Sequence, residues 1–204
     1  FEQKMSTNSQ MIYDDLILAG VDEAGRGPLA GDVIAAAVIL CPKNKIPGLI
    51  DSKKLSEKNR QKFDAQIKHK SLCWSIARAN LQEIETYNIL EATMLAMKRA
   101  IEGLSLSPEY IIVDGNRLPS WPYPSEALVR GDSIVPCVSA ASIIAKVYRD
   151  KEMRDLDKIY PGYGFSSHKG YGTKEHIDAI KRLGPTPIHR KTFEPMKSIV
   201  TRTL

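Results

Sequence analysis

The sequence predicts an α/β protein in which a mixed sheet carries helices on its faces. Residues 32–40 form a nearly continuous apolar run rich in valine and isoleucine, which is typical of a central strand buried on both faces. Residues 88–103 instead have apolar side chains at helical spacing, at Leu90, Met94, Met97 and Ile101. The expected strands and helices do not alternate regularly, so a mixed sheet fits better than a doubly wound parallel sheet.

The first half of the chain predicts a hairpin, a helix and a third strand. A strand over residues 16–21 is joined to the run at 32–40 by a turn with three glycines and a proline, which favours a hairpin. Ser56 is a typical N-cap for a helix that continues to about Lys70. Residues 72–79 follow as the third strand, and Gly103 is a natural end for the helix that starts near residue 88.

The second half predicts two more strands and two helices. Residues 110–113 and 127–129 have the composition of strands, the second of them short. Residues 139–160 predict a long helix that the following Pro-Gly pair interrupts. Thr173 is expected to cap a last amphipathic helix that ends at Gly184, before a basic, proline-containing tail.

The length and composition predict one domain. The chain has 204 residues, 43% of them hydrophobic, which is enough for one good core. We expect this domain over residues 16–204, with a helical C-terminal segment, after a tail at 1–15 whose residues 1–4 precede a candidate start at Met5. No apolar run approaches the roughly 20 residues of a membrane span, and no leader signals export. A cytoplasmic location is the expectation.

Charge and cysteine content restrict the classes of partner and metal. The formal net charge of +5 permits a polyanionic partner but does not demonstrate one. Cys41, Cys73 and Cys137 lie far apart in apolar surroundings, and no CxxC or Cys–His pairing occurs. We interpret them as buried thiols in a reducing compartment rather than as zinc ligands or disulfides.

Acidic residues stand at the ends of apolar strands in three places: Asp22 with Glu23, Asp114, and Asp132. Strand ends are where an α/β scaffold presents reactive groups beside one another. Converging carboxylates repel one another, and hard divalent cations with oxygen ligands relieve that repulsion. Mg²⁺ or Mn²⁺ is therefore the expected cofactor, and two such ions can assist an in-line phosphoryl displacement. Taken alone, any one of these acids fits an ordinary strand-end cap or a solvated turn residue better than a metal ligand. For Asp22 and Glu23, the adjacent Gly-rich turn favours the metal ligand instead.

Gly25, Arg26 and Gly27 follow the first acidic pair almost directly. Glycine lets the backbone approach a ligand closely, and exposed N–H groups can bind a hydroxyl or a phosphate. The spacing is not that of a Walker loop. On its own, the tripeptide also fits a simple hairpin turn with an exposed arginine.

Several motifs occur in a characteristic order. Gly20–Pro28, with the sequence GVDEAGRGP, is highly specific. The others are residues 51–55 (DSKKL), 113–116 (VDGN), 131–132 (GD), 139–150 (SAASIIAKVYRD), 168–173 (HKGYGT) and 187–190 (PIHR). Over roughly residues 18–195 this set resembles the type 2 ribonucleases H, the bacterial ribonuclease HII group.

The resemblance implies a ribonuclease H-like fold with a five-stranded mixed sheet flanked by helices. It implies an endoribonuclease that acts on RNA–DNA hybrids and cuts 5′ to single ribonucleotides embedded in duplex DNA, leaving 3′-hydroxyl and 5′-phosphate ends. It also implies that the metal-binding, catalytic carboxylates are Asp22, Glu23, Asp114 and Asp132, with Asp22 as the bridging ligand. A monomer is the default expectation.

The resemblance further implies how the ribose is recognised. The backbone of Gly25, Arg26 and Gly27 would bind the ribose 2′-hydroxyl, the group that distinguishes RNA from DNA at a given site. Tyr171 would stack on the deoxyribose beside the ribonucleotide. Without the family likeness, Tyr171 would be interpreted as a loop tyrosine that packs on the domain.

Candidates for phosphate contacts are Ser52, Lys53, Ser142 and Lys146. A solvated helix face or a cap explains these residues as well, although Ser142 and Lys146 share one helix face. Asp150 competes for the place of the fourth carboxylate ligand, but within its helix it is expected to point away from the strand ends.

Two alternatives stay open. A nucleic-acid binder without catalysis would keep the fold and lose part of the carboxylate set, whereas this sequence has all four acids. A DNA resolvase or DNA-strand nuclease of the same fold would need no contact to a 2′-hydroxyl, whereas the turn at residues 25–27 offers one. Fold alone does not decide between them.

Overall fold

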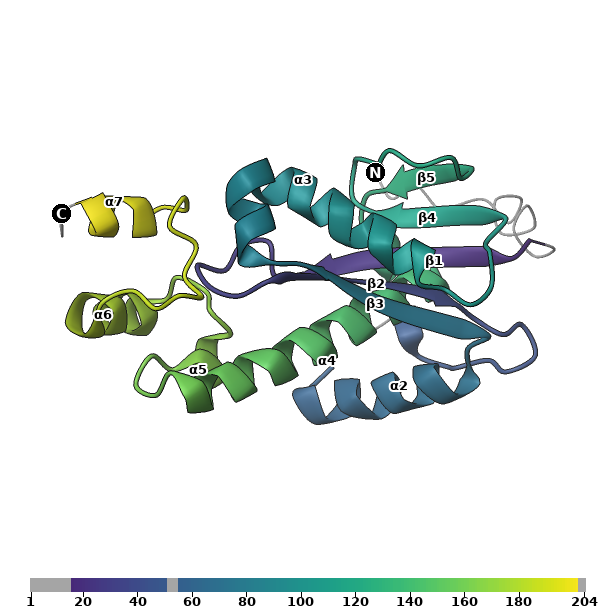
Figure 1. Ribbon diagram of the computed structural model, residues 1–204. Coiled ribbons are helices and arrows are strands. Elements are labelled where there is room, and N and C mark those ends of the chain that lie inside the picture. Colours follow the sequence, from purple (N-terminus) through teal and green to yellow (C-terminus); the bar gives the residue numbers. More distant parts are fainter. Residues whose placement is uncertain (1–15, 51–54, 202–204) are drawn as a thin grey trace, which may run out of the picture.

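The computed structural model describes residues 16–50 and 55–201, which form a five-stranded mixed sheet with helices on both faces (Figure 1). The strand order is β3-β2-β1-β4-β5. The strands are β1 (Leu18–Ala24), β2 (Val33–Ile39), β3 (Cys73–Ala79), β4 (Tyr110–Asp114) and β5 (Ser125–Leu128). Neighbours β1, β2 and β3 pair antiparallel, whereas β1, β4 and β5 pair parallel. The predicted mixed sheet and its first hairpin are confirmed.

The helices divide between the two faces of the sheet and one of its ends. α3 (Leu81–Glu102) covers one face, and α2 (Glu57–Lys70) lies with α4 (Pro136–Ile159) on the other (Figure 1). The C-terminal part gathers beyond one end of the sheet (Figure 1). It consists of α5 (Phe165–His168), α6 (Lys174–Leu183) and α7 (Met196–Thr201).

Strand β2 is the centre of the core. All seven of its residues are buried, as its continuous apolar sequence predicts. Successive side chains of a strand point to opposite faces. Val33, Ala35 and Ala37 accordingly pack in the cluster under α3, while Ile34 and Ala36 pack with residues of α2 and α4.

The close approach of α4 to β1 depends on Gly20. A Cβ at Gly20 would lie 2.2 Å from the backbone carbonyl carbon of Cys137 and 2.2 Å from the backbone nitrogen of Val138, in the first turn of α4. No side chain fits there, so β1 and the start of α4 lie in direct backbone contact. This packing places α4 beside the acidic residues at the end of β1.

Two helices begin earlier than the sequence predicts. α3 begins at Leu81 because Asn80 and Glu83 form a reciprocal capping box. The apolar period starts only after a break at Asn88, whose φ of 69° and ψ of 167° are not helical. α4 begins at Pro136 rather than Ser139, because proline suits the first turn of a helix.

The predicted caps and two of the predicted thiols are confirmed. Ser56 and Thr173 accept backbone hydrogen bonds at the starts of α2 and α6. Cys73 and Cys137 are buried, but the expectation is wrong for Cys41, which is only half-buried; all three thiols are free. No described helix has the length and apolar character needed to traverse a bilayer.

Candidate active site

The register of the sheet brings the predicted acids together. β1 and β4 are parallel, with Val21 opposite Val113, so the next residues, Asp22 and Asp114, lie side by side. A short 3-10 helix, η2 (Gly131–Ser133), follows β5 and brings Asp132 to the same place. The backbone N–H of Asp132 donates to Oδ1 of Asp114 at 3.4 Å.

Two of the four acids are buried, whereas Glu23 and Asp114 are half-buried. Asp22 is 5% exposed and Asp132 is 3% exposed. Burial raises the pKa of Asp22 well above its usual range, and the charges of Glu23 and Asp114 raise it further. The Ser142 hydroxyl and the Glu23 backbone N–H, the latter 2.7 Å from Asp22 Oδ1, partly offset this rise by donating hydrogen bonds. The cluster therefore gathers more negative charge than its surroundings neutralise.

The pKa of Glu23 is also raised, although less than that of Asp22. Burial raises the pKa of Glu23, and the Asp114 charge adds to the rise. Arg26 opposes it through an ion pair in which Nη1 lies 3.2 Å from Oε1 of Glu23. Arg26 thus contributes a compensating charge at the edge of the acidic cluster.

This donor set has the chemistry that a hard divalent cation requires. Carboxylate oxygens are the preferred ligands of Mg²⁺ and Mn²⁺, and a bound cation favours the charged form of the acids around it. Among residues 16–50 and 55–201, no three His, Cys, Asp or Glu side chains form a ready-made metal-binding group. The four acids would therefore have to close further around an ion.

A cavity of about 370 Å³ opens beside the acids. Glu23 and Asp132 form part of its wall, together with the turn at residues 24–27 and Tyr171. The rest of its lining comes from α2 and α4 and consists of Arg60, Ser142, Ile143, Lys146 and Arg149. Most of the predicted substrate-binding residues therefore face one space, whereas Ser52 and Lys53 lie outside the described residues.

The glycine turn is packed too tightly for side chains. Gly25 has a φ of +99°, and a Cβ there would lie 2.1 Å from Nε of Arg149. A Cβ at Gly27 would lie 3.4 Å from Cε1 of Tyr171. The Tyr171 ring therefore stands directly beside the turn, and this residue is 46% exposed.

α4 presents a polar face to the cavity. Ser142 donates its hydroxyl to Asp22. Lys146, one turn later, forms an ion pair with Asp150 in which Nζ lies 2.7 Å from Oδ1. Asp150 is only 4% exposed and is not among the residues that line the cavity.

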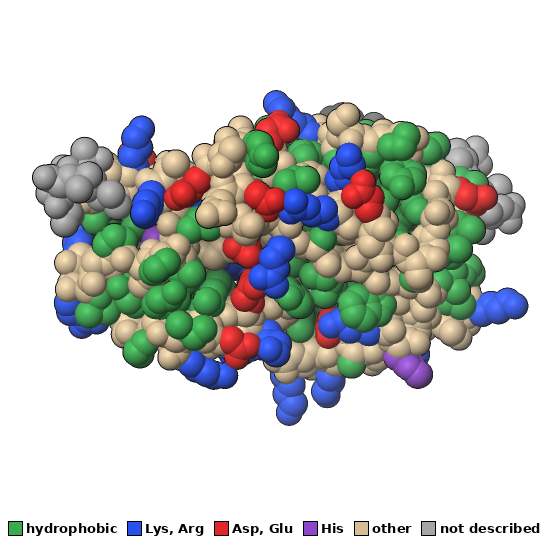
Figure 2. Space-filling model, in the orientation of Figure 1, with side chains coloured by type: hydrophobic (Ala, Val, Ile, Leu, Met, Phe, Trp, Pro, Cys, Tyr) green, Lys and Arg blue, Asp and Glu red, His purple; other side chains and the backbone are tan. Residues whose placement is uncertain are grey.

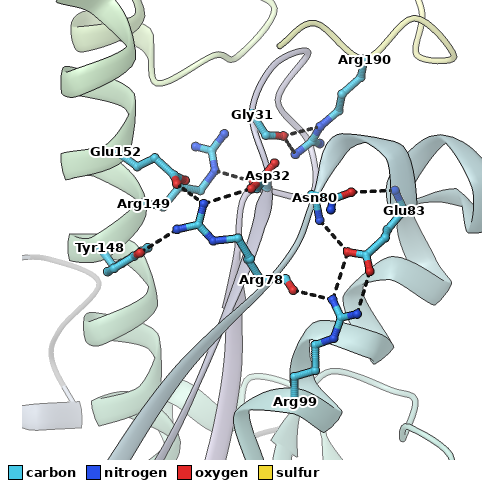
Figure 3. A network of polar contacts seen from close by, with 10 residues as sticks. All are labelled: Gly31, Asp32, Arg78, Asn80, Glu83, Arg99, Tyr148, Arg149, Glu152 and Arg190. Carbon is cyan, nitrogen blue, oxygen red and sulfur yellow. Dashed lines mark hydrogen bonds and ion pairs between the residues drawn. The ribbon is translucent and has the colours of Figure 1, made fainter. Parts of the chain in front are cut away.

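The far end of the turn is anchored by Arg78 of β3 (Figure 3). Nη1 of Arg78 lies 3.3 Å from Oδ2 of Asp32 and 2.8 Å from Oε1 of Glu152, and Nη2 donates to the Tyr148 hydroxyl at 2.7 Å.

Figure 2 shows acidic and basic side chains next to one another across the middle of one face of the molecule. This face therefore carries paired charges rather than a uniformly basic patch.

Three arginines of this region were not singled out from the sequence. Arg60 of α2 lines the cavity while its Nη1 donates to the Leu55 carbonyl at 2.6 Å. Arg149 and Arg190 are 1% and 0% exposed. Both belong to motifs of the family resemblance, but arginine is mostly a surface residue, so nothing in the sequence indicates their burial.

The sequence model of the family Ribonuclease HII matches residues 19–196. The chain belongs to the ribonuclease HII family. A similar solved structure is the ribonuclease H2 from Pyrococcus horikoshii OT3, with 28% identity, a TM-score of 0.77, and coverage of 91% of this chain and 97% of that chain.

Two more distant structures share the fold. One is the RNase HII of the PCNA:RNase HII complex from Archaeoglobus fulgidus, with 23% identity, a TM-score of 0.69, and coverage of 89% of this chain and 94% of that one. The other is Bst-RNase HIII in complex with Mn²⁺, with 18% identity, a TM-score of 0.72, and coverage of 91% and 69%.

These likenesses confirm the expected ribonuclease H-like fold and the class of enzyme. As a member of this family, the protein has ribonuclease H activity on RNA–DNA hybrids. Enzymes of the ribonuclease H family use divalent metal ions. The alternative of a non-catalytic nucleic-acid binder is thereby excluded.

Proposed function

We propose that this ribonuclease HII also cuts 5′ to single ribonucleotides embedded in duplex DNA, leaving 3′-hydroxyl and 5′-phosphate ends. The observation that carries the proposal is one cavity whose wall contains Glu23 and Asp132 of the carboxylate cluster, the tight glycine turn and the exposed Tyr171. The carboxylates serve the hydrolysis, and the turn and Tyr171 select the ribose. A nuclease that cuts DNA strands would not need the turn and Tyr171, because its substrate has no ribose 2′-hydroxyl.

In this proposal the metal ligands are Asp22, Glu23, Asp114 and Asp132, with Mg²⁺ or Mn²⁺ as the cation. Asp22 would be the central ligand of this set, since it is buried and feels the charges of both Glu23 and Asp114. Two ions held by these carboxylates would supply an activated water and charge stabilisation for the leaving 3′ oxygen. The water attacks phosphorus, the bond to the 3′ oxygen breaks, and that oxygen takes up a proton.

The other residues hold the substrate in place. Backbone N–H groups of the turn at residues 25–27 bind the 2′-hydroxyl of the ribonucleotide, and the Tyr171 ring stacks on the next deoxyribose. Ser142 keeps Asp22 oriented through its hydrogen bond. Lys146 stands at the cavity wall, where it contacts a substrate phosphate. We propose phosphate contacts for Ser52 and Lys53 from the sequence alone.

The test is a DNA duplex with one ribonucleotide, labelled at the 5′ end of the cut strand. We expect one product, cut 5′ to the ribonucleotide, with Mg²⁺ or Mn²⁺ and none with a chelator. The same duplex without the ribonucleotide is the control and should stay intact. Equal cutting of the control duplex, or cutting in chelator, would contradict the proposal.

The proposal includes a monomer that acts in the cytoplasm in ribonucleotide excision during DNA replication and repair. Because phosphate contacts release counterions, cutting at low substrate concentration should slow as salt rises. Size-exclusion chromatography at several protein concentrations tests the monomer, and a mass that doubles with concentration would contradict it.

A further inference from the structure

Arg190 is a buried cation whose hydrogen bonds all go to the glycine turn. Its Nη2 donates to the carbonyls of Gly25 at 2.6 Å and Gly31 at 2.7 Å. Its Nη1 donates to those of Arg26 at 2.9 Å and Pro28 at 2.8 Å, and Nε donates to Gly31 at 2.9 Å. A guanidinium has five N–H bonds, so every donor is used on a backbone carbonyl.

Burying a charged guanidinium only to hold an ordinary turn would be unfavourable in free energy. Arginine is rarely buried without an acidic partner, because removing its charge from water is unfavourable. Burial and the neighbouring charge of Arg149 lower the pKa of Arg190 to about 9, so the guanidinium still carries its charge at neutral pH. Asp32 provides the nearby negative charge, and the Phe193 ring lies 5.1 Å from the guanidinium carbon.

The direction of these carbonyls fixes the direction of the N–H groups. In a planar trans peptide the carbonyl of one residue and the N–H of the next point in opposite directions. The one cis bond in the described chain is Glu194–Pro195, so the turn is trans throughout. Because the carbonyls of Gly25 and Arg26 point at Arg190, the N–H groups of Arg26 and Gly27 point away from it. Arg190 does not line the cavity, whereas Gly25, Arg26 and Gly27 do.

The segment that carries Arg190 is itself attached to the turn. Ala30 and His189 form a β-bridge, Gly31 N–H donates to the Ile188 carbonyl at 2.9 Å, and Arg190 N–H donates to the Leu29 carbonyl at 2.8 Å. Figure 3 shows the Arg190 fork on the Gly31 carbonyl and, beside it, Arg149 reaching the backbone of Asp32. The backbone contacts therefore hold the guanidinium in one position.

We propose that Arg190 is a positioning residue for ribose recognition. It draws the carbonyls of the turn inward and thereby aims the N–H groups of Arg26 and Gly27 at the 2′-hydroxyl. The charge also polarises these peptide groups, which makes their N–H bonds stronger donors. This inference rests on the proposed function of the turn as the site that binds the ribose.

The first test uses Arg190→Lys, which keeps the charge but offers three donors from a single atom. Binding is measured with Mg²⁺ in an Asp114→Asn background, so that no cleavage interferes. The measured quantity is the ratio of the dissociation constants for an all-DNA duplex and for the same duplex with one ribonucleotide. We expect Arg190→Lys to lower this ratio about tenfold, because two hydrogen bonds to the hydroxyl are misdirected. Affinity for the all-DNA duplex should change by less than about twofold, because phosphate contacts carry it.

Two controls separate positioning from a general loss of stability. Arg182→Lys makes the same chemical change at an exposed arginine of α6 and should leave the ratio unchanged. Ile180→Ala empties a buried position in the same C-terminal part and should lower the melting temperature without changing the ratio. In ¹⁵N–¹H spectra, the amide signals of Arg26 and Gly27 should move in Arg190→Lys and stay in place in Arg182→Lys.

A milder variant keeps the inference testable if Arg190→Lys does not fold. Phe193→Leu retains Arg190 but removes the aromatic ring next to its guanidinium, and we expect it to lower the ratio about twofold. A ratio equal to that of the unaltered protein in the folded variants would overturn the role of Arg190. If the unaltered protein itself shows no preference for the ribonucleotide, the proposed function fails instead.

Discussion

At the scale of single residues, the proposed mechanism depends on a cluster of acids in which burial raises the pKa of Asp22 and Glu23. Asp22 and Asp114 are adjacent across β1 and β4, and the Asp114 charge raises the pKa of Asp22. We expect Asp22→Asn and Asp114→Asn each to lower single-turnover cleavage with Mg²⁺ by about 10³-fold or more, because a lost ligand removes several kcal/mol of charge stabilisation. Hybrid binding should stay within a few-fold.

Asp155→Asn is the matched control for these two variants. Asp155 lies on the outer side of α4, where it pairs with Lys151 and Lys158. Removing this exposed carboxylate should leave the cleavage rate unchanged. Activity equal to that of the unaltered protein in either site variant would refute the ligand roles.

Tyr171 carries the second prediction at this scale. Its half-exposed ring beside Gly27 is free to stack on a sugar. Tyr171→Ala should slow cutting at a single embedded ribonucleotide about tenfold, because stacking on an aromatic ring contributes roughly 1–3 kcal/mol. Tyr171→Phe keeps the ring and should cut nearly normally. Equal rates for all three proteins would remove the stacking role.

The site could be predicted as far as its chemistry follows from strand ends and motifs. Asp22, Glu23 and Asp114 follow apolar strands, so their convergence could be anticipated. The contacts of Arg149 and Arg190 could not, because they join positions more than 100 residues apart and depend on burial that arginine rarely has.

At the scale of secondary-structure elements, the break in α3 at Asn88 combines backbone strain with a helix cap, and both affect the free energy of unfolding. Asn88 adopts a backbone conformation that only glycine adopts readily, while its side chain accepts hydrogen bonds from the N–H groups of Leu90 at 2.9 Å and Glu91 at 3.2 Å. Asn88→Ala loses this cap and keeps the strain, so it should lower the free energy of unfolding by about 1–2 kcal/mol.

Asn88→Gly is the informative companion variant. It loses the same cap but relieves the strain, and its free energy of unfolding in urea should stay within about 0.5 kcal/mol of the unaltered protein. Neither variant should affect cleavage. If the glycine variant is as unstable as the alanine variant, backbone strain is not the cause.

The ends of the elements could be predicted where a cap is encoded locally. α2 and α6 start after Ser56 and Thr173 as expected, because a hydroxyl side chain bonds the first free N–H groups. The sequence did not predict the first turns of α3, because the side chains before Asn88 do not share the apolar spacing of those after it. α5 has only four residues, too few for a period to show.

At the scale of the whole molecule, a buried histidine pair links pH to stability. His176 and His189 are both 0% exposed, with their Nε2 atoms 3.1 Å apart. Burial lowers the pKa of each to about 4. Unfolding returns these pKa values to about 6.5, so the unfolded chain binds more protons below that pH.

We therefore expect stability to be fully present above about pH 6.5 and to fall by a few kcal/mol as the pH drops towards 4. Asp22 acts in the opposite sense, because its raised pKa favours the folded state in acid. Melting temperatures between pH 7.5 and 4.5 should fall less steeply in a His176→Gln, His189→Gln double variant than in the unaltered protein. Parallel curves would show that the pair does not titrate on unfolding.

The contact between Arg190 and the glycine turn also has a consequence for synthesis on the ribosome. Strands β1, β2 and β3 all precede residue 80, so the hairpin and its acids emerge from the ribosome well before the C-terminal part. The turn receives its guanidinium 165 residues after Gly25, long after the hairpin itself has been made. A nascent or prematurely terminated chain without residue 190 would thus carry the proposed metal ligands but lack the arginine that we propose aims the ribose contact.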